Sequence, residues 1–488
     1  MSAPDVEVAI VGTGFSGLGM AIQLQKANRS SFVLLEKAGE VGGTWRDNHY
    51  PGCACDIPSH LYSFSFEPNP RWSRMFATQP EIFDYLRRCA DKYNLRPKIR
   101  FHCAVERIEF DDREAFWRIS IAGGATLTAR YVVLGIGPLS RPTLPSIPGL
   151  ETFAGKRFHS TEWDHRYDLD GKTVAVIGTG ASAIQFVPEV AQRAKRLHLF
   201  QRTPPWVLPR PDRAISPREQ RLFSGLPIFQ QLYRYWIYWL MEWRAIGFSV
   251  DPRIMKLVAL AGRQHIRKHI LDPSLQKALT PTYLPGCKRI LMSNDYYPAL
   301  ARSNVEVVTS ELVRAGAETL VTRDGAERKV DAIIFGTGFR VSEYLTPIEV
   351  RGRDGTDLNT RWRERTEAYL GTTVAGFPNF FTLLGPNTAL GHNSVVFMME
   401  AQLRHVLDCM RASDAHEGRP IEVRQDAQRA FNESLEPRLR RAVWASGCQS
   451  WYLDAEGKNI ALWPGFTVDF WRRTLRLKTT DYSFDEVE

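Results

Sequence analysis

Short apolar runs in the chain are separated by stretches with helical spacing, and this pattern predicts parallel strands joined by helices. Two such runs, Val6–Val11 and Phe32–Leu35, flank the first helical stretch. The same order recurs at Thr173–Ile177 and Leu197–Phe200. Apolar runs that alternate with helical patterns are typical of βαβ units in a parallel sheet. We therefore expect an α/β protein with two related modules.

Further apolar runs follow each module and predict a β-meander. After the first module, the expected strands are Lys98–Phe110, Phe116–Ile121, Ala125–Thr128 and Tyr131–Leu134. After the second, Val305–Val308 and Leu320–Thr322 are expected to flank a hairpin with an Asp324-Gly325 turn, before a closing strand at Ala332–Phe335. The two closing strands run into Gly135-Ile-Gly137 and Gly336-Thr-Gly338. Such strand–glycine turns suit places where the chain passes a ligand or crosses between domains.

Each predicted βα turn carries a glycine fingerprint. The first reads Gly12-x-Gly14-x-x-Gly17 and the second reads Gly178-x-Gly180-x-x-Ala183. Glycines at these positions let the backbone approach a pyrophosphate, which rests on the helix N-terminus. One fingerprint alone is a weak signal, but two in matching strand and helix context predict two dinucleotide sites.

The charge that follows each fingerprint by nineteen residues differs between the modules. Glu36 closes the first module's second strand, and Arg202 lies just past that of the second. A carboxylate accepts a hydrogen bond from a free ribose 2′-hydroxyl, whereas an arginine favours a 2′-phosphate. The first module is therefore expected to bind FAD or NAD, and the second NADP(H). A chain that binds both is expected to be a flavoprotein reductase or monooxygenase.

Two further motifs separate these possibilities. The stretch Gly42-Gly43-Thr44-Trp45 lies where a flavin-dependent disulfide reductase continues into a Cys-x-x-x-x-Cys pair, but Trp45 takes the place of the first cysteine. It continues through Tyr50-Pro51-Gly52 to Asp56. Between the modules lies a linker motif, Phe153-x-Gly155-x-x-x-His159-x-x-x-Trp163-Asp164.

With these motifs, nearly the whole chain resembles the type I Baeyer–Villiger monooxygenases. The resemblance implies two Rossmann-like dinucleotide-binding domains in a disulfide-reductase-like architecture, with FAD and NADPH as cofactors. It also implies an activity, in which NADPH reduces the flavin and O2 forms a flavin peroxide. This peroxide inserts one oxygen atom into a ketone to give an ester or lactone. A nitrogen- or sulfur-oxygenating flavin monooxygenase and a flavoprotein without oxygenase activity remain as alternatives.

The resemblance assigns a catalytic cation. In relatives an arginine follows a lysine after a glycine, and the matching segment here reads Gly286-Cys287-Lys288-Arg289. Arg289 is the implied catalytic residue, and Asp56 is implied to pair with it. A fixed cation suits this reaction because negative charge develops on the peroxide and on the tetrahedral adduct. A solvated basic turn is the alternative interpretation of this pair of residues taken alone.

Other implied roles concern the cofactors and the linker motif. Lys288, Arg202 and Thr203 are implied to hold the 2′-phosphate, and Trp451 resembles a tryptophan that contacts NADP in relatives, although core packing explains it equally well. His159 is expected to take no acid–base role, and its motif is linked to domain movement in the family. The residues expected to bind cofactor are Gly12, Gly14, Phe15, Ser16, Gly17, Glu36, Gly43, Thr44, Trp45, Asp56, Tyr62, Val105, Gly178, Thr179, Gly180, Ala181, Ser182, Ala183, Gln201, Arg202, Thr203, Lys288, Asn393 and Trp451.

A helix is predicted to begin after Asn393 and Ser394 and to cover Val395–Met410, with these two residues as its caps. If its N-terminus lies near the flavin, its dipole stabilises the anionic reduced ring. An ordinary cap is an equally good interpretation.

The expected domain boundaries follow from the modules and the prolines between them. Residues 1–145 and 339–488 form the FAD-binding domain and a C-terminal segment that contacts substrate and cofactor. Residues 146–205 and 281–338 form the NADPH-binding domain, and the aromatic-rich residues 206–280 form a helical insertion.

Composition narrows the partners. The net charge of +9 comes from 63 basic and 54 acidic residues spread along the chain, without a nucleic-acid-binding motif. The seven cysteines form no C-x-x-C pair, so we expect reduced thiols in the cytoplasm and no metal site. The first expected strand begins at about Val6, with no charged and apolar regions before it, so we expect no signal peptide. No stretch reaches the roughly 20 apolar residues that span a bilayer. The aromatic stretch Leu232–Trp243 predicts a buried or interface helix, with peripheral membrane contact through residues 226–243 or a substrate lid as the alternative. The identity of the ketone and the oligomeric state remain open.

Overall fold

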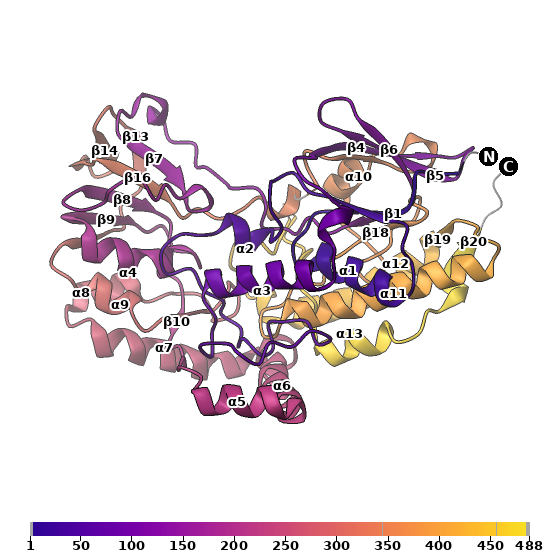
Figure 1. Ribbon diagram of the computed structural model, residues 1–488. Coiled ribbons are helices and arrows are strands. Elements are labelled where there is room, and N and C mark those ends of the chain that lie inside the picture. The colour runs from indigo at the N-terminus through magenta and orange to yellow at the C-terminus, as the bar shows by residue number, and fades with distance from the viewer. Residues whose placement is uncertain (1–2, 344, 455, 485–488) are drawn as a thin grey trace.

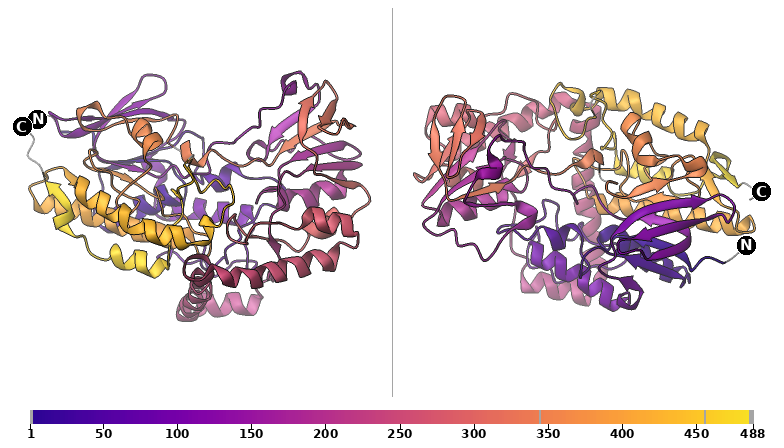
Figure 2. Two further views of the ribbon diagram at one scale, coloured as in Figure 1. Left: turned by 180° about the vertical axis from the view of Figure 1, so that it is seen from behind. Right: turned by 90° about the horizontal axis from the view of Figure 1, so that it is seen from above.

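Two separate sheets, each covered by helices, form the body of the molecule. The structure is a computed structural model that describes residues 3–343, 345–454 and 456–484. One sheet and its helices lie on the left of Figure 1 and the other on the right, and the views in Figure 2 keep the two groups apart. The fold is the predicted α/β class with two Rossmann-like units, which confirms the fold class.

The larger sheet contains eight strands in the order β17-β4-β5-β6-β1-β2-β3, with β18 paired to β6. Its central strand β1 pairs in parallel with β2 and β6 and is almost completely buried. The strands are β1 (Val6–Val11), β2 (Phe32–Leu35), β3 (Ile99–Arg100), β4 (Val105–Asp111), β5 (Phe116–Ile121), β6 (Thr126–Leu134), β17 (Glu349–Arg351) and β18 (Phe380–Thr382).

The second sheet contains five parallel strands in the order β12-β9-β8-β16-β7. They are β7 (Lys156–His159), β8 (Thr173–Ile177), β9 (Arg196–Phe200), β12 (Val305–Val308) and β16 (Ala332–Phe335). An antiparallel sheet beside it contains β13 (Leu312–Ala315), β14 (Thr319–Thr322) and β15 (Glu327–Lys329). Two strand pairs lie outside these sheets: β10 (Val207–Leu208) with β11 (Leu291–Met292), and β19 (Ile421–Val423) with β20 (Tyr482–Phe484).

Each fingerprint leads into a helix, as predicted. Helix α1 follows the first fingerprint and packs against α11, whereas α4 follows the second and packs against α9. The helices of the two nucleotide-binding units and the C-terminal segment are α1 (Phe15–Lys26), α2 (Thr44–Asp47), α3 (Gln79–Lys92), α4 (Ala183–Arg193), α9 (Tyr296–Leu300), α10 (Leu358–Glu364), α11 (Val395–Ala415), α12 (Gln425–Arg441) and α13 (Thr467–Arg473).

The predicted insertion between β10 and β11 is helical. It contains α5 (Pro217–Gly225), α6 (Pro227–Glu242), α7 (Met255–His269) and α8 (Pro273–Leu279), with a π-helical turn at Ile246–Val250. Helices α5, α6 and α7 lie along one edge of the molecule, at the bottom of Figure 1. Among the described residues, no helix combines the length and the apolar character needed to cross a bilayer.

Four of the predicted strands differ from the structure in extent or in partner. The run Lys98–Phe110 is divided into β3 and β4, because the chain turns at Phe101 and His102, where His102 has a φ of +55°. The runs Ala125–Thr128 and Tyr131–Leu134 belong to one continuous strand, β6. Strand β12 pairs with β9 in the parallel sheet instead of flanking the hairpin, and the Asp324-Gly325 turn joins β14 to β15. Periodicity identified these strands but not their partners, which depend on long-range packing.

Candidate active site

One large cavity lies between the two nucleotide-binding units. Its volume is about 1280 Å³, and residues of both fingerprints line it. Pockets for one small ligand occupy roughly 300–1,000 Å³. The cavity is therefore large enough for more than a single cofactor.

The glycines of the first fingerprint let the backbone itself form the cavity wall, with no side chain between it and a ligand. Gly12 has a φ of +96°, and a Cβ atom on Gly17 would lie 1.9 Å from the Gly12 carbonyl oxygen. Gly43 also has a positive φ, and a Cβ there would lie 3.1 Å from the Gly14 Cα. Glycine is the residue that permits both conformations and both contacts. These residues fit a dinucleotide pyrophosphate at the start of α1.

Glu36 lies on the cavity at the end of β2 and is almost fully buried. Its Oε2 atom accepts hydrogen bonds from the backbone N–H of Thr13 at 3.1 Å and from the Thr13 hydroxyl at 2.6 Å. Its Oε1 atom accepts from the Ala38 N–H at 3.0 Å and pairs with Arg46 at 2.9 Å. These contacts hold the carboxylate in one orientation, which suits a fixed acceptor for ribose hydroxyl groups.

The second fingerprint is built in the same way against the strand–glycine turn after β16. Gly178 has a φ of +107°, and a Cβ on it would lie 2.4 Å from the Gly336 carbonyl oxygen. The other turn, after β6, contacts the first fingerprint, since a Cβ on Gly12 would lie 2.8 Å from the Gly135 carbonyl oxygen. Both turns line the cavity, as expected for places where the chain passes a ligand.

Arg202 and Lys288 come together on the second unit's side of the cavity. Burial lowers the pKa of Lys288, and the nearby positive charge of Arg202 lowers it further. In the described part of the chain neither cation has a carboxylate partner, and the Lys288 ammonium lies 5.2 Å from the centre of the Tyr283 ring. Two adjacent cations without a counter-ion form an anion-binding site suited to a phosphate.

Arg289 and Asp56 form an ion pair on the same cavity. The Nη2 and Nε atoms of Arg289 donate to Asp56 Oδ2 at 2.6 and 3.0 Å. The Asp56 charge raises the pKa of Arg289, so the guanidinium stays charged throughout the accessible pH range. About one third of each side chain remains exposed, at 34% for Arg289 and 30% for Asp56. Arg289 is thus a cation that Asp56 holds in place and that still faces the cavity.

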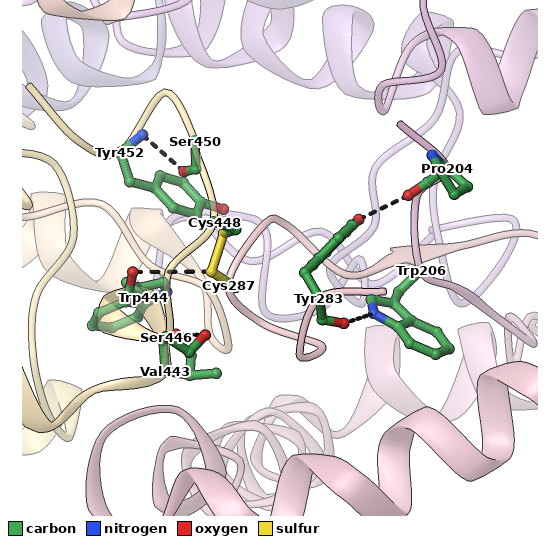
Figure 3. Close-up of a disulfide and its surroundings, with 10 residues drawn as sticks. All are labelled: Pro204, Trp206, Tyr283, Cys287, Val443, Trp444, Ser446, Cys448, Ser450 and Tyr452. Atoms are coloured by element: carbon green, nitrogen blue, oxygen red, sulfur yellow. Dashed lines mark hydrogen bonds between the residues drawn. A yellow bond between two sulfur atoms is a disulfide. The ribbon is translucent and has the colours of Figure 1, made fainter. Parts of the chain in front are cut away.

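A disulfide holds the segment that carries Arg289. Cys287 is bonded to Cys448, with their Cα atoms 6.1 Å apart, and Figure 3 shows the bond joining the loop before Arg289 to the C-terminal segment. The expectation that the thiols are reduced is therefore wrong for these two cysteines. They are separated by 161 residues, and only the packing of the C-terminal segment against this loop brings them together. Cys53, Cys55, Cys89, Cys103 and Cys409 are free thiols.

The C-terminal segment places one aromatic side chain on the cavity and a second beside Arg289. Trp451 lines the cavity and is 43% exposed, so core packing does not account for it. Tyr452 is buried beside Arg289, and burial raises its pKa to about 12. Its closeness to the catalytic candidate was not predicted, because no motif in the sequence links it to the loop of residue 289.

Helix α11 begins at the cavity, with Asn393 on the cavity wall. Ser394 caps the helix by accepting from the Val396 N–H at 3.3 Å, which confirms the predicted cap for this residue. Asn393 accepts instead from the Ser394 N–H at 2.8 Å, and the helix extends beyond Met410 to Ala415. The Asn393 amide donates to Glu242 Oε2 at 2.7 Å.

Glu242, a residue of α6, is a buried carboxylate that the sequence did not identify as a site residue. It also accepts from the Thr467 hydroxyl at 2.8 Å and from the Val468 N–H at 3.0 Å, and His392 lies 3.7 Å away. Burial by itself would raise the pKa of Glu242, but these hydrogen-bonding groups outweigh it and lower the pKa. The available signal in the sequence was a single acidic residue within the aromatic stretch Leu232–Trp243.

The linker motif lies away from the cavity wall, within the second unit. Trp163 is buried between Phe158 and Phe186, and Asp164 pairs with Lys156 at 2.7 Å. His159 ends β7 at the edge of the five-stranded sheet, and burial lowers its pKa to about 4. It is therefore neutral near pH 7. The other two motif residues, Phe153 and Gly155, pack against each other, since a Cβ on Gly155 would lie 2.6 Å from the Phe153 ring.

Almost all of the residues expected to bind cofactor line the cavity. Those that do are Gly12, Gly14, Phe15, Ser16, Glu36, Gly43, Thr44, Trp45, Asp56, Tyr62, Val105, Gly178, Thr179, Gly180, Ala181, Ser182, Gln201, Arg202, Thr203, Lys288, Asn393 and Trp451. Gly17 and Ala183 lie behind the wall and pack against the backbone of Gly12 and Gly336.

Gln185 of α4 connects the two units and was not predicted. Its side chain accepts from the Tyr50 hydroxyl at 2.9 Å and donates to the Ala54 carbonyl at 2.9 Å. A Cβ on Gly52 would lie 2.6 Å from the Gln185 carbonyl oxygen, so glycine is required at this contact. The motif between Gly42 and Asp56 is thereby held against the second unit.

Comparisons with known proteins agree with this geometry. The profile of the family described as pyridine nucleotide-disulphide oxidoreductase matches residues 9–228. A Baeyer–Villiger monooxygenase of Pseudomonas aeruginosa is 51% identical over 483 residues, which are 99% of this chain and 92% of that protein. A Baeyer–Villiger monooxygenase of Streptomyces coelicolor is 49% identical, covering 98% of this chain and 92% of that protein.

Solved structures are similar over the same extent. Oxidized steroid monooxygenase bound to NADP is 29% identical with a TM-score of 0.88, covering 99% of each chain. The closed structure of cyclohexanone monooxygenase is 26% identical with a TM-score of 0.86, covering 99% of this chain and all of the other.

Proposed function

The chain belongs to the Baeyer–Villiger monooxygenases, and on this premise we propose that Arg289, oriented by Asp56, is the cation that stabilises negative charge during oxygen insertion. The enzyme uses FAD and NADPH. It converts a ketone, O2, NADPH and a proton into an ester or lactone, NADP⁺ and water. The observation that carries the proposal is the ion pair on the cavity that both fingerprints line.

The cavity residues fit the two cofactors. The first fingerprint and Glu36 suit FAD, and the second fingerprint with Arg202, Thr203 and Lys288 suits NADPH. When bound, these cofactors supply the electrons and the activated oxygen. The chain itself supplies the positions of these groups and the electrostatic environment of the reacting ketone.

Arginine suits the proposed role because of its partner and its pKa. The Asp56 carboxylate holds two guanidinium donors and leaves the Nη1 edge free of this contact. Since the pKa of Arg289 is raised, the side chain holds its proton while negative charge develops near it. A preorganised donor of this kind contributes about 10²–10³ in kcat.

The test of this role is Arg289→Ala in the FAD-loaded enzyme. We expect NADPH to bleach the flavin absorbance anaerobically at the wild-type rate, whereas the yield of ester or lactone falls by about 100-fold or more. The assay measures NADPH consumption and inserted oxygen by mass spectrometry across linear, cyclic and aryl ketones. Arg289→Lys should not restore the yield, because an ammonium lacks the planar fork that pairs with Asp56.

A matched control removes an arginine–aspartate pair at the surface. Arg193 contacts Asp170 at 2.6 Å on the outside of the second unit, away from the cavity. Arg193→Ala should keep the wild-type ester yield. An Arg289→Ala enzyme that forms ester at the wild-type rate would remove this residue from the mechanism. Oxidation of only an amine or sulfide by the wild-type enzyme would refute the ketone activity.

A further inference from the structure

Helix α6 has large apolar side chains on its exposed side as well as on its buried side. Its buried side chains include Ile237, Tyr238 and Met241. Eight other large apolar side chains, from residue 228 to residue 243, are between 46% and 63% exposed: Ile228, Phe229, Leu232, Tyr235, Trp236, Trp239, Leu240 and Trp243. Their spacing of three, four and seven residues places them on one face of the helix. A water-facing helix surface normally carries polar residues there.

Neighbouring parts of the insertion extend this apolar surface. Leu222 and Leu226 next to α6 are 42% and 50% exposed, and Leu257 and Leu260 of α7 are 67% and 58% exposed. Helices α5, α6 and α7 lie along the same edge of the molecule in Figure 1. We call the exposed apolar residues of α5–α7 the apolar edge. Contiguous surfaces of this kind mark sites that contact a partner or a membrane.

The charge of the insertion identifies the partner's chemistry. Residues 206–280 contain twelve Lys and Arg residues against five Asp and Glu residues, a net charge of +7, whereas the whole chain carries +9. Four of these cations, Arg218, Arg221, Lys256 and Arg263, are exposed on α5 and α7. In the described residues none of the four forms an ion pair with a carboxylate. The edge is therefore both apolar and strongly basic.

We propose that the apolar edge docks on an anionic lipid surface, with α6 lying in the plane of the membrane. Amphipathic helices with basic residues and Trp, Phe and Leu bind bilayers in this way, and Trp and Tyr concentrate at the water–lipid boundary. Each Lys or Arg near an anionic lipid surface strengthens the attraction to it. A second copy of the chain is the poorer partner, because a two-fold dimer through this edge would bring together two insertions that each carry a net charge of +7.

Helix α6 also connects this edge to the cavity. On its buried side Glu242 accepts a hydrogen bond from Asn393, which lines the cavity wall. The helix that would rest on the lipid thus also positions part of the reaction site. Docking of this edge places the enzyme beside apolar ketones that partition into the bilayer.

The test uses the FAD-loaded enzyme and sedimentation with vesicles. We expect the enzyme to pellet with vesicles that contain phosphatidylglycerol and phosphatidylcholine, and to bind pure phosphatidylcholine vesicles about tenfold less tightly or worse. Raising the salt concentration should weaken binding. The double variant Trp236→Ser/Trp239→Ser should lower binding by about tenfold or more while flavin content and NADPH consumption in solution stay at wild-type values.

Two further variants distinguish this proposal from non-specific hydrophobic binding and from dimerisation. Leu475→Ser removes an exposed leucine (39%) outside the insertion and should leave vesicle binding unchanged. Lys256→Glu/Arg263→Glu should weaken binding to the anionic vesicles. The proposal is overturned if the enzyme stays in the supernatant with both vesicles, or if it binds both equally. It is also overturned if light scattering shows a dimer that the tryptophan double variant abolishes, without vesicle binding by the wild type.

Discussion

The choice of NADPH over NADH is expected to depend on Arg202 and Lys288. These two cations lie together on the cavity without carboxylate partners in the described part of the chain. In NADPH the 2′-phosphate supplies the missing negative charge, whereas NADH has only a hydroxyl at this position. Arg202→Ala and Lys288→Ala should therefore weaken NADPH binding and leave NADH binding nearly unchanged.

The size of the effect follows from the contacts that each variant removes. A hydrogen bond to a charged group contributes about 1.5–3 kcal/mol, which corresponds to roughly a 10- to 150-fold change in KM or Kd. The double variant should lose less than the product of the two single effects. The two cations lie close together and are expected to contact one phosphate, so their contributions to binding are coupled and not independent.

The assay measures the rate of flavin reduction against NADPH and NADH concentration in stopped flow. NADH serves as the internal control for folding and flavin content. Lys195→Ala, which removes an exposed lysine of the same unit outside the cavity, is the matched charge control and should keep the wild-type preference. Equal losses with both coenzymes, or an unchanged KM for NADPH in both single variants, would refute the assignment of these cations to the 2′-phosphate.

Two further predictions concern the buried links around the cavity. Glu242→Gln should lower the free energy of unfolding by about 2–3 kcal/mol in urea titrations at pH 7, because it removes a charged acceptor from Asn393, Thr467 and the Val468 N–H. Since the pKa of Glu242 is lowered in the folded state, the wild type loses this contribution to its free energy of unfolding as the pH falls below about 4. A stability difference between wild type and variant that grows on acidification would contradict the argument. Thiol titration of the unfolded, unreduced enzyme should find five reactive thiols among its seven cysteines. Cys448→Ser should lower the free energy of unfolding by about 2–4 kcal/mol, whereas Cys103→Ser, which removes a free thiol, should change it little. Seven titratable thiols in the wild type would disprove the disulfide.

Much of the fold could be predicted from the sequence because the patterns that specify its strands and turns are local. Strands such as Val6–Val11, Thr173–Ile177 and Ala332–Phe335 agree with the prediction to the residue, since buried parallel strands need continuous apolar runs. The fingerprints could also be predicted from the sequence, because few residues other than glycine tolerate a positive φ next to a passing backbone. Strand partners were less readable. The position of β12 beside β9 depends on how the second unit packs as a whole, and no local pattern specifies that.

The sequence by itself determined the two dinucleotide units and the opposite charges at Glu36 and Arg202, and it also indicated the family. These features depend on residues within one βαβ unit or one short motif. Only the tertiary structure decided the contacts that complete the site. Arg289 and Asp56 are 233 residues apart, Cys287 and Cys448 are 161 apart, and Glu242 and Asn393 are 151 apart. The physical reason is that such pairs form where separately folded elements pack together, and the geometry of that packing is a property of the whole chain.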